Sequence, residues 1–316
     1  MKKQMEITRR KLLLGGSAVL GASALLGPQK AMAADGVVTP FSNYNGNALL
    51  PPGRIGIQLY TVRDQIENLG FARTFEILRG IGFTSVEFAG YTQGTGPITT
   101  KEIRKLLTAN DLIGIGSHAA QDDASIKAAV DLDLPYTGIA ILFPQGGDRA
   151  GWEQTAEAMN AFGKKSSKHG VKFYWHLHGP EYAPVLDEPA VRGLDILLEH
   201  TDKDYVALEM DIYWAYFFQT TFPGYDPLEY VTKYRDRFEL FHVKDGKKDA
   251  KGTWSNPGDI SDVGQGHIDF ERFFQQLGGP LDHWYINERD NADRHSQGSF
   301  CSAQCSYLYM RYGLRR

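Results

Sequence analysis

The chain has 316 residues, of which 42% are hydrophobic and 23% are charged, and its formal net charge is −4. This balance excludes an intrinsically disordered protein, because disordered chains combine low hydrophobicity with high net charge. A single α/β barrel of about 250 residues or more accounts for the length without a second domain.

The first 33 residues predict an export signal. A basic region precedes an apolar run over 12–26 and a small-residue cleavage site over 31–33. The adjacent Arg9 and Arg10 resemble a twin-arginine motif, which directs export of folded proteins. We therefore expect an exported, periplasmic protein. A permanent membrane anchor is not expected, because Gly and Ser residues interrupt the apolar run.

Removal of residues 1–33 makes the remaining chain more acidic. The segment contains six basic residues and one glutamate, so the formal charge changes from −4 to about −9 without it. Binding to nucleic acid requires a cationic surface. We therefore expect no nucleic-acid partner.

A flexible tether over 34–53, rich in Gly, Asn and Pro, precedes a predicted folded domain at 54–316. In this domain short apolar runs alternate with longer amphipathic stretches. The predicted strands are 55–60, 84–89, 112–117, 137–143, 171–176, 206–211, 238–243 and 284–288. The predicted helices are 71–81, 100–110, 123–132, 152–169, 188–200, 228–234, 268–277 and 300–312. Eight strand–helix pairs without a glycine-rich turn after the first strand predict an α/β fold, the (β/α)8 TIM barrel.

Four residues able to bind a metal lie at the C-terminal ends of the last four predicted strands: His176, Asp211, His242 and Glu288. In a closed barrel these strand ends lie together on the face where active sites form. Each residue alone could be a hydrogen-bonded loop residue, but four at equivalent positions favour a metal site. Two imidazoles and two carboxylates suit one divalent ion of Mn, Mg, Co, Fe or Zn.

Six short segments resemble motifs of the xylose-isomerase-like barrel family of sugar phosphate isomerases and epimerases. They are IGIQLYTVRD at 55–64, GFTSVEFAGY at 82–91, WHLH at 175–178, MDIYW at 210–214, FHVKD at 241–245 and VGQG at 263–266. The resemblance spans about residues 54–290 and implies the barrel and the metal site. The activities of that family include ketose epimerisation, aldose–ketose isomerisation, dehydration of inososes and dehydroshikimate, and endonuclease action.

The resemblance implies a reaction in which a base removes a proton next to a carbonyl group that the metal polarises. Glu288 is one candidate base, and His118 and His178 are the others. The alternative for each is a side chain that hydrogen-bonds to other residues of the site without touching the substrate. The candidates for binding the substrate are Glu87, Glu181, Trp214, Lys244 and Asp245.

His176 stands where the family's ketose 3-epimerases have a catalytic glutamate, the partner of the one matching Glu288. A branch with the His-x-His pattern includes enzymes that act on oxidised sugars and glycosides by elimination. We expect a metal-dependent sugar isomerase or epimerase that acts on an unphosphorylated sugar or keto-sugar. The alternative is a lyase that acts on a 3-keto-glycoside or an inosose-like ketone.

Two other functions are weaker predictions. An abasic-site endonuclease needs a cationic groove, which the charge of about −9 disfavours. An exported sugar-binding barrel without catalysis is expected to have lost a metal ligand, whereas all four positions carry competent side chains. The expected partner is therefore a small-molecule sugar, and self-association as a homo-oligomer stays open.

Cys301 and Cys305 lie four residues apart in the last predicted helix. A disulfide between them would be strained, so we expect them to pack as thiols. An oxidising compartment leaves a bridge open.

Overall fold

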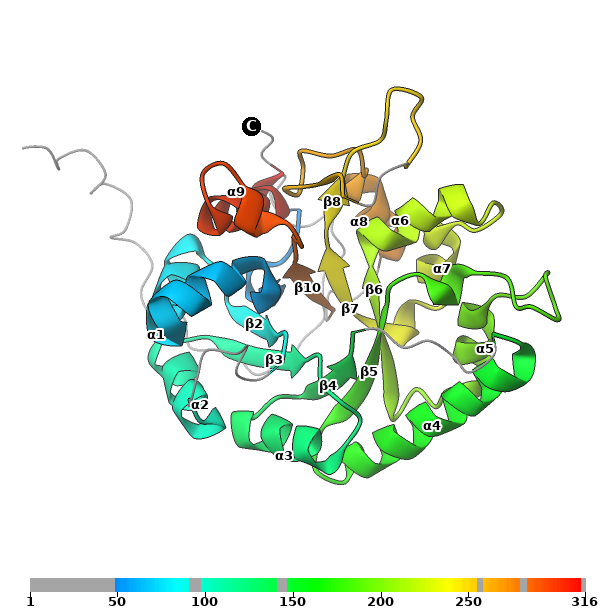
Figure 1. Ribbon diagram of the computed structural model, residues 1–316, viewed down its shortest axis with the longest axis horizontal. Coiled ribbons are helices and arrows are strands. Elements are labelled where there is room, and N and C mark those ends of the chain that lie inside the picture. The colour runs from blue at the N-terminus through cyan, green and yellow to red at the C-terminus, as the bar shows by residue number, and fades with distance from the viewer. Residues whose placement is uncertain (1–48, 91–97, 141–146, 255–257, 279–282, 314–316) are drawn as a thin grey trace, which may run out of the picture. The chain divides into compact units, whose positions relative to one another are not determined.

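A parallel sheet of eight strands, curved into a barrel, forms the centre of the structure (Figure 1). The structure is a computed structural model that describes residues 49–90, 98–140, 147–254, 258–278 and 283–313. The predicted export signal and most of the predicted tether, up to residue 48, lie outside these ranges. No helix within the described ranges is long and apolar enough to cross a membrane.

The barrel strands are β1 (Ile55–Gln58), β2 (Ser85–Phe88), β3 (Ile113–Ser117), β4 (Tyr136–Ile139), β5 (Lys172–Leu177), β6 (Val206–Asp211), β7 (Phe238–Val243) and β10 (Trp284–Asn287). They are neighbours in the order β3, β2, β1, β10, β7, β6, β5, β4, and the ladders between them are parallel. A bridge between His118 and Gly138 links β3 to β4 across the remaining gap. The barrel is therefore nearly closed, and the predicted TIM-barrel fold is confirmed.

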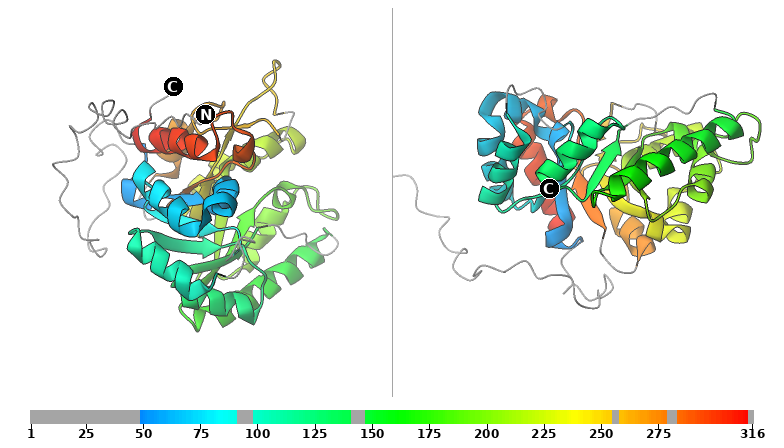
Figure 2. Two further views of the ribbon diagram at one scale, coloured as in Figure 1. Left: turned by 60° about the vertical axis from the view of Figure 1, so that its left-hand side comes forward. Right: turned by 90° about the horizontal axis from the view of Figure 1, so that it is seen from below.

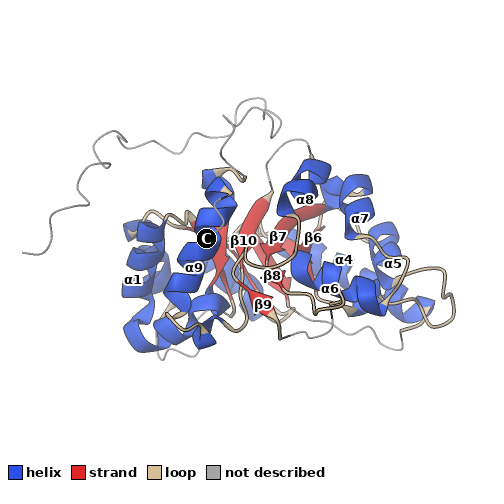
Figure 3. Ribbon diagram, turned by 90° about the horizontal axis from the view of Figure 1, so that it is seen from above, coloured by secondary structure: helices blue, strands red, loops and turns tan. Residues whose placement is uncertain are grey.

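Helices cover the outside of the barrel, as three further views show (Figure 2; Figure 3, strands red and helices blue). They are α1 (Arg63–Ile81), α2 (Thr100–Ala109), α3 (Asp123–Leu132), α4 (Arg149–Ser167), α5 (Gly193–His200), α6 (Ile212–Thr221), α7 (Pro227–Lys233), α8 (Phe270–Leu277) and α9 (Ser299–Tyr312). A short antiparallel pair, β8 (Asp245–Gly246) and β9 (Ile260–Ser261), follows β7. In α8, Phe270, Phe273 and Phe274 are buried at the three- and four-residue spacing that turns one helix face toward the core.

The structure differs from the predicted elements mainly in the helices. α1 begins at Arg63, well before the predicted start at 71, and Gly70 interrupts it with a φ of 74°. α6 is absent from the predicted helices because its sequence IYWAYFFQTT lacks a separate polar face. The last residues of the strand predicted at 137–143 lie outside the described ranges.

The two ends of the described chain pack together at α9. Leu50 is buried, and its backbone N–H donates a hydrogen bond of 3.0 Å to the carbonyl of Met310. Contact with the barrel thus begins before the predicted start at residue 54. Cys301 and Cys305, both on α9, are partly buried and are not joined by a disulfide.

Alternation along the strands builds two layers of side chains inside the barrel. The first layer is an apolar cluster with one residue from each of five strands: Ile115, Tyr174, Ala207, Leu240 and Ile286. Side chains two positions apart on a strand point to the same side, so the next inward positions toward the C-terminal ends form a second layer. That layer is polar and includes His176, Glu209, His242 and Glu288.

Gly138 leaves space for the ring of Tyr174, because a Cβ at this position would lie 2.3 Å from the ring carbon Cζ. We predict that Gly138→Ala lowers the free energy of unfolding by about 1–3 kcal/mol, the usual cost of overpacking. Urea denaturation followed by circular dichroism measures this change. The control is Gly80→Ala in α1, where a Cβ would meet nothing within 4 Å. The control should be neutral or slightly stabilising, and an equal loss in both variants would contradict the prediction.

Candidate functional site

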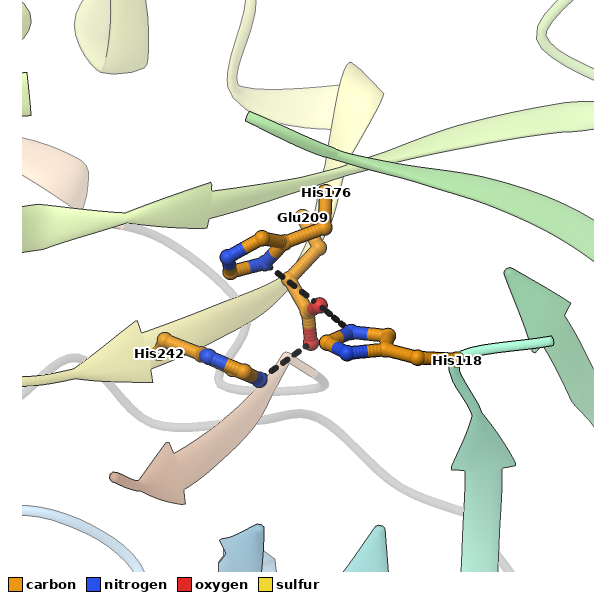
Figure 4. A group of neighbouring side chains, drawn as sticks. All are labelled: His118, His176, Glu209 and His242. Carbon is orange, nitrogen blue, oxygen red and sulfur yellow. Dashed lines mark hydrogen bonds and ion pairs between the residues drawn. The ribbon is translucent and has the colours of Figure 1, made fainter. Parts of the chain in front are cut away.

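The polar layer gathers three histidines around one carboxylate (Figure 4). Glu209 on β6 is fully buried, and its Oε2 lies 2.8 Å from Nδ1 of His176 on β5. The same oxygen lies 3.2 Å from Nε2 of His118, which follows β3. Oε1 of Glu209 lies 3.3 Å from Nε2 of His242 on β7. Side chains from four barrel strands or their ends therefore meet at Glu209.

Glu87 on β2 is a second buried carboxylate of this layer. Its Oε2 accepts a hydrogen bond of 2.9 Å from Nε2 of Gln58 and lies 2.6 Å from Nε2 of His242. Its Oε1 accepts a hydrogen bond from the Tyr174 hydroxyl and lies 3.5 Å from Nε2 of His118. Glu87, predicted to bind substrate, thus has neighbouring protein groups at both oxygens.

Lys244 places an ammonium group among three carboxylates. It directly follows β7 and is two residues beyond His242, so both side chains point to the same side of the chain. Its Nζ lies 2.8 Å from Oδ2 of Asp211, 2.7 Å from Oε2 of Glu288 and 3.1 Å from Oδ2 of Asp290. Lys244 is fully buried, so it is a fixed cation of the site.

His176 and His242 lie between Glu209 on one side and the carboxylates that pair with Lys244 on the other. His176 faces Glu209 with Nδ1, while its Nε2 lies 3.8 Å from Oδ2 of Asp211. His242 faces Glu209 with Nε2, while its Nδ1 lies 2.8 Å from Oε2 of Glu288. The structure thus brings together all four residues predicted to bind the metal.

Burial and neighbouring charges shift the pKa values of the three histidines in different directions. Burial alone would lower the pKa of His242, but the surrounding carboxylates, Glu209 first among them, raise it well above the usual value. The pKa of His118 is also raised, because Glu87 and Glu209 outweigh the effect of burial. Burial, together with the positive charge of His242, lowers the pKa of His176 well below its usual value.

The pKa values of the two carboxylates nearest Lys244, Asp211 and Glu288, shift in opposite directions. Burial raises the pKa of Asp211 to about 6, although Lys244 opposes the shift. Burial would raise the pKa of Glu288 as well, but Lys244 and His242 outweigh it and lower this pKa well below the usual value. Glu288 is therefore firmly ionised and accepts a proton poorly.

A cavity of about 460 Å³ adjoins these residues. Its lining includes Tyr60, Arg63, His178, Trp214, Asp290 and Arg294. The ring centroids of His178 and Trp214 lie 5.3 Å apart. Burial, with the charge of Lys244, lowers the pKa of His178 to about 3. Nδ1 of His178 is buried and has no hydrogen-bond partner in the described part of the chain, so a neutral imidazole with one unpaired nitrogen lies beside the cavity.

Glu181 and Asp245, both predicted to contact substrate, hold the loops beside the site. Glu181 accepts hydrogen bonds from Nε1 of Trp175 at 2.6 Å and from the backbone N–H of Gly179 at 2.9 Å. Asp245 accepts a hydrogen bond of 2.9 Å from the backbone N–H of Gly266. A Cβ on Gly266 would lie 2.1 Å from Oδ1 of Asp245, which explains the glycine in the VGQG segment.

The donor atoms of the site are close enough to share a cation. Three groups have donor atoms within 4.8 Å of one another: Asp211, His242 and Glu288; His176, His178 and Asp211; and His118, His176, Glu209 and His242. All are nitrogen or oxygen donors, a combination suited to divalent ions such as Zn, Mn, Fe or Co. The residues thus fit a divalent metal chemically.

Glu209 and Asp290 belong to the site, although neither is among the site residues predicted from the sequence. Glu209 lies two residues before Asp211, so both point to the same side of β6. A charged residue two positions before Asp211 on the same strand was the available signal for Glu209. Asp290 lies beyond the end of β10, where alternation no longer predicts the direction of a side chain.

Comparison with known proteins agrees with this architecture. Residues 75–300 match the family described as Xylose isomerase-like TIM barrel. Over 142 residues the chain is 28% identical to an inosose dehydratase from Clostridium perfringens, a match that covers 40% of this chain and 42% of that protein. The chain thus matches less than half of the length of this curated relative.

Solved structures with the same fold include a sugar phosphate isomerase/epimerase from Parabacteroides distasonis, with a TM-score of 0.62, 21% identity, and coverage of 85% of this chain and 94% of that chain. Another is the IolI protein with a bound zinc atom, with a TM-score of 0.61, 11% identity, and coverage of 83% and 100%. At these identities the similarity concerns the fold. The family match covers residues 75–300, which is most of this chain, so the chain belongs to the xylose isomerase-like TIM-barrel family.

Proposed function

We propose that this chain is a divalent-metal-dependent isomerase or epimerase that removes a proton next to a carbonyl group of an unphosphorylated sugar or keto-sugar. The observation that carries the proposal is the convergence of donor atoms from Asp211, His242 and Glu288 within 4.8 Å at the C-terminal end of the barrel. The adjoining cavity of about 460 Å³ is large enough for a small ligand.

The proposed metal ligands are His176, Asp211, His242 and Glu288. The chemistry that a divalent ion supplies when bound here is polarisation of the substrate carbonyl. Zinc in the IolI protein supports a divalent ion of unknown identity. Lys244 already places a positive charge against Asp211 and Glu288, so it competes with the metal for these oxygens.

His178 and His118 suit opposite roles in proton transfer. His178 is the proposed base by position, because it lines the cavity and is neutral. Burial lowers its pKa to about 3, so it is a weaker base than an ordinary imidazole. Glu87 and Glu209 raise the pKa of His118 against the effect of burial, which suits a proton donor. Glu288 is likewise a weak base, because Lys244 and His242 lower its pKa against the effect of burial, and its Oε2 is already paired with both residues.

The charges around the cavity support an unphosphorylated substrate. The guanidinium of Arg63 is paired with Asp293 at 2.8 Å and lies 4.0 Å from the ring centroid of Tyr60. Asp290 also lines the cavity, so a phosphate group would meet carboxylates as well as cations. The indole of Trp214 offers an aromatic face suited to the C–H side of a sugar ring.

Elimination from a 3-keto-glycoside or an inosose-like ketone is the second candidate. It is supported by the 28% identity to an inosose dehydratase and by His176 in the position of an epimerase glutamate.

Export to the periplasm, supported by Arg9 and Arg10, is also part of the proposal, since free sugars and glycosides are more available there than sugar phosphates.

The reaction can be tested by incubating the metal-loaded protein in D₂O with free keto-sugars, 3-keto-glycosides and inososes. We expect proton NMR to show exchange of one hydrogen next to the carbonyl, together with an isomer or epimer, because removal of that proton starts the reaction. Elimination would instead give an unsaturated ketone with ultraviolet absorbance. The phosphorylated sugars serve as controls. Binding without exchange would indicate a sugar-binding protein and contradict the proposal.

The metal ligands can be tested by substitution. We predict that His242→Ala loses most of its bound metal, as measured by mass spectrometry after dialysis against Zn²⁺ and then buffer. Lys244→Met should bind Zn²⁺ more tightly, because the ammonium that neutralises Asp211 and Glu288 is gone. The control is His200→Ala, at a partly exposed histidine of α5. Unchanged metal content in His242→Ala would reject the ligand assignment.

The pH dependence of stability tests the neutral state of His178. Its pKa of about 3 in the folded protein lies below the value of about 6.5 for an unfolded chain. The unfolded chain therefore binds the extra proton between these values, and folding stability falls as the pH falls. We predict that the metal-free protein loses up to about 2 kcal/mol of unfolding free energy between pH 7 and pH 5 through this residue.

Urea titrations of the chelator-treated protein at both pH values measure this loss. His178→Gln should retain the corresponding stability at pH 5. His169→Gln, at an exposed position, should follow the wild type. If His178→Gln and the wild type lost equal stability on acidification, His178 would not be held neutral by the fold.

A further inference from the structure

Two carboxylates of the polar layer, Glu87 and Glu209, lie outside the proposed metal-ligand set but contact two of its members. Glu209 lies 2.8 Å from Nδ1 of His176. Glu87 lies 2.6 Å from Nε2 of His242, and Glu209 lies 3.3 Å from the same nitrogen. Each of the two proposed histidine ligands therefore has one ring nitrogen occupied by a buried carboxylate.

The opposite nitrogens of these histidines face the other carboxylates. Nε2 of His176 lies 3.8 Å from Oδ2 of Asp211, and Nδ1 of His242 lies 2.8 Å from Oε2 of Glu288. A histidine ligand is commonly fixed in its ring orientation and tautomer by a carboxylate at its second nitrogen. The geometry here matches that arrangement for both residues.

We infer that Glu209, together with Glu87, is a positioning residue that selects Nε2 of His176 and Nδ1 of His242 for the metal. This inference rests on the proposed function, because it assumes that these histidines bind the metal. Glu209 has the larger role, since it contacts histidines that come from β3, β5 and β7 (Figure 4). It therefore fixes the relative orientation of the three rings.

Because Glu209 is buried against the histidine rings, its replacement is expected to change the contacts of those rings. Both carboxylate oxygens face imidazole nitrogens, and the side chain is fully buried. Oε2 of Glu209 pairs with His118 and His176, and Oε1 forms an ion pair with His242. A glutamine is uncharged and replaces one of these two oxygens with an amide N–H₂ group. Glu209→Gln therefore cannot keep the contacts of both oxygens, and we expect at least one histidine to change its tautomer or rotate.

The test measures Zn²⁺ affinity by competition with a chromophoric chelator in Glu209→Gln, Glu209→Asp and the wild type. We expect about 10–100-fold weaker binding in Glu209→Gln and partial recovery in Glu209→Asp, which keeps a carboxylate. In the Zn²⁺-loaded protein, long-range ¹⁵N NMR of the histidine rings should show a changed nitrogen environment for His176. Circular dichroism verifies that each variant is folded.

The matched control is Glu239→Gln. Glu239 lies near the start of β7, where it accepts a hydrogen bond of 2.7 Å from the Tyr136 hydroxyl. It is a partly buried carboxylate of the same barrel that also forms an ion pair with Lys172. Among the described residues, no hydrogen bond or ion pair joins it to the three histidines. Its substitution should leave Zn²⁺ affinity and the histidine ¹⁵N signals unchanged.

Two results would overturn the inference. Unchanged Zn²⁺ affinity and unchanged ¹⁵N signals in folded Glu209→Gln would show that Glu209 does not position the ligands. Loss of Zn²⁺ in Glu209→Gln with normal binding in Asp211→Asn and Glu288→Gln would show that Glu209 itself binds the metal. In the second case the proposed ligand set fails as well. Loss of Zn²⁺ in Asp211→Asn and Glu288→Gln, with weakened binding in Glu209→Gln, supports both proposals.

Discussion

The pairing of buried carboxylates with imidazole and ammonium groups inside the barrel is the constraint on which the site depends. Glu87, Glu209 and Asp211 are fully buried, and an unpaired ion in that position costs several kcal/mol. His242 and Lys244 provide the compensating positive charges. These groups can therefore keep their charges only in the arrangement described, which holds the reactive side chains in fixed positions.

Strand alternation explains how so many charged groups enter the barrel without disrupting it. Tyr174, Ala207 and Leu240 belong to an apolar layer, and the inward side chains two residues further along the same strands are polar. The apolar layer excludes water from one side of the polar layer. Near the C-terminal strand ends, His178 and Asp290 line the cavity that adjoins the polar layer.

The sequence alone predicts the barrel and part of the site. The strand-end rule predicted His176 and His242 in the same place because alternation and strand order bring them there. The same rule does not point to Glu209, because it applies to the last residue of a strand and not to the inward position two residues earlier. Asp245 shows the opposite limit, since its side chain turns to backbone groups that come close only through the folded β8–β9 region.

The proposed reaction is limited by which groups can move a proton at the cavity. In the two-carboxylate epimerases that the sequence resembles, a base acts on each face of the substrate, and the resemblance places His176 at the position of one of them. His176 is instead held between Glu209 and Asp211. The neutral imidazole at the cavity is His178. One such group can carry a proton between neighbouring atoms on a single face, which suits aldose–ketose isomerisation or elimination. Epimerisation would require a second proton donor on the opposite face, and His118, whose pKa is raised, is the residue whose charge fits that role.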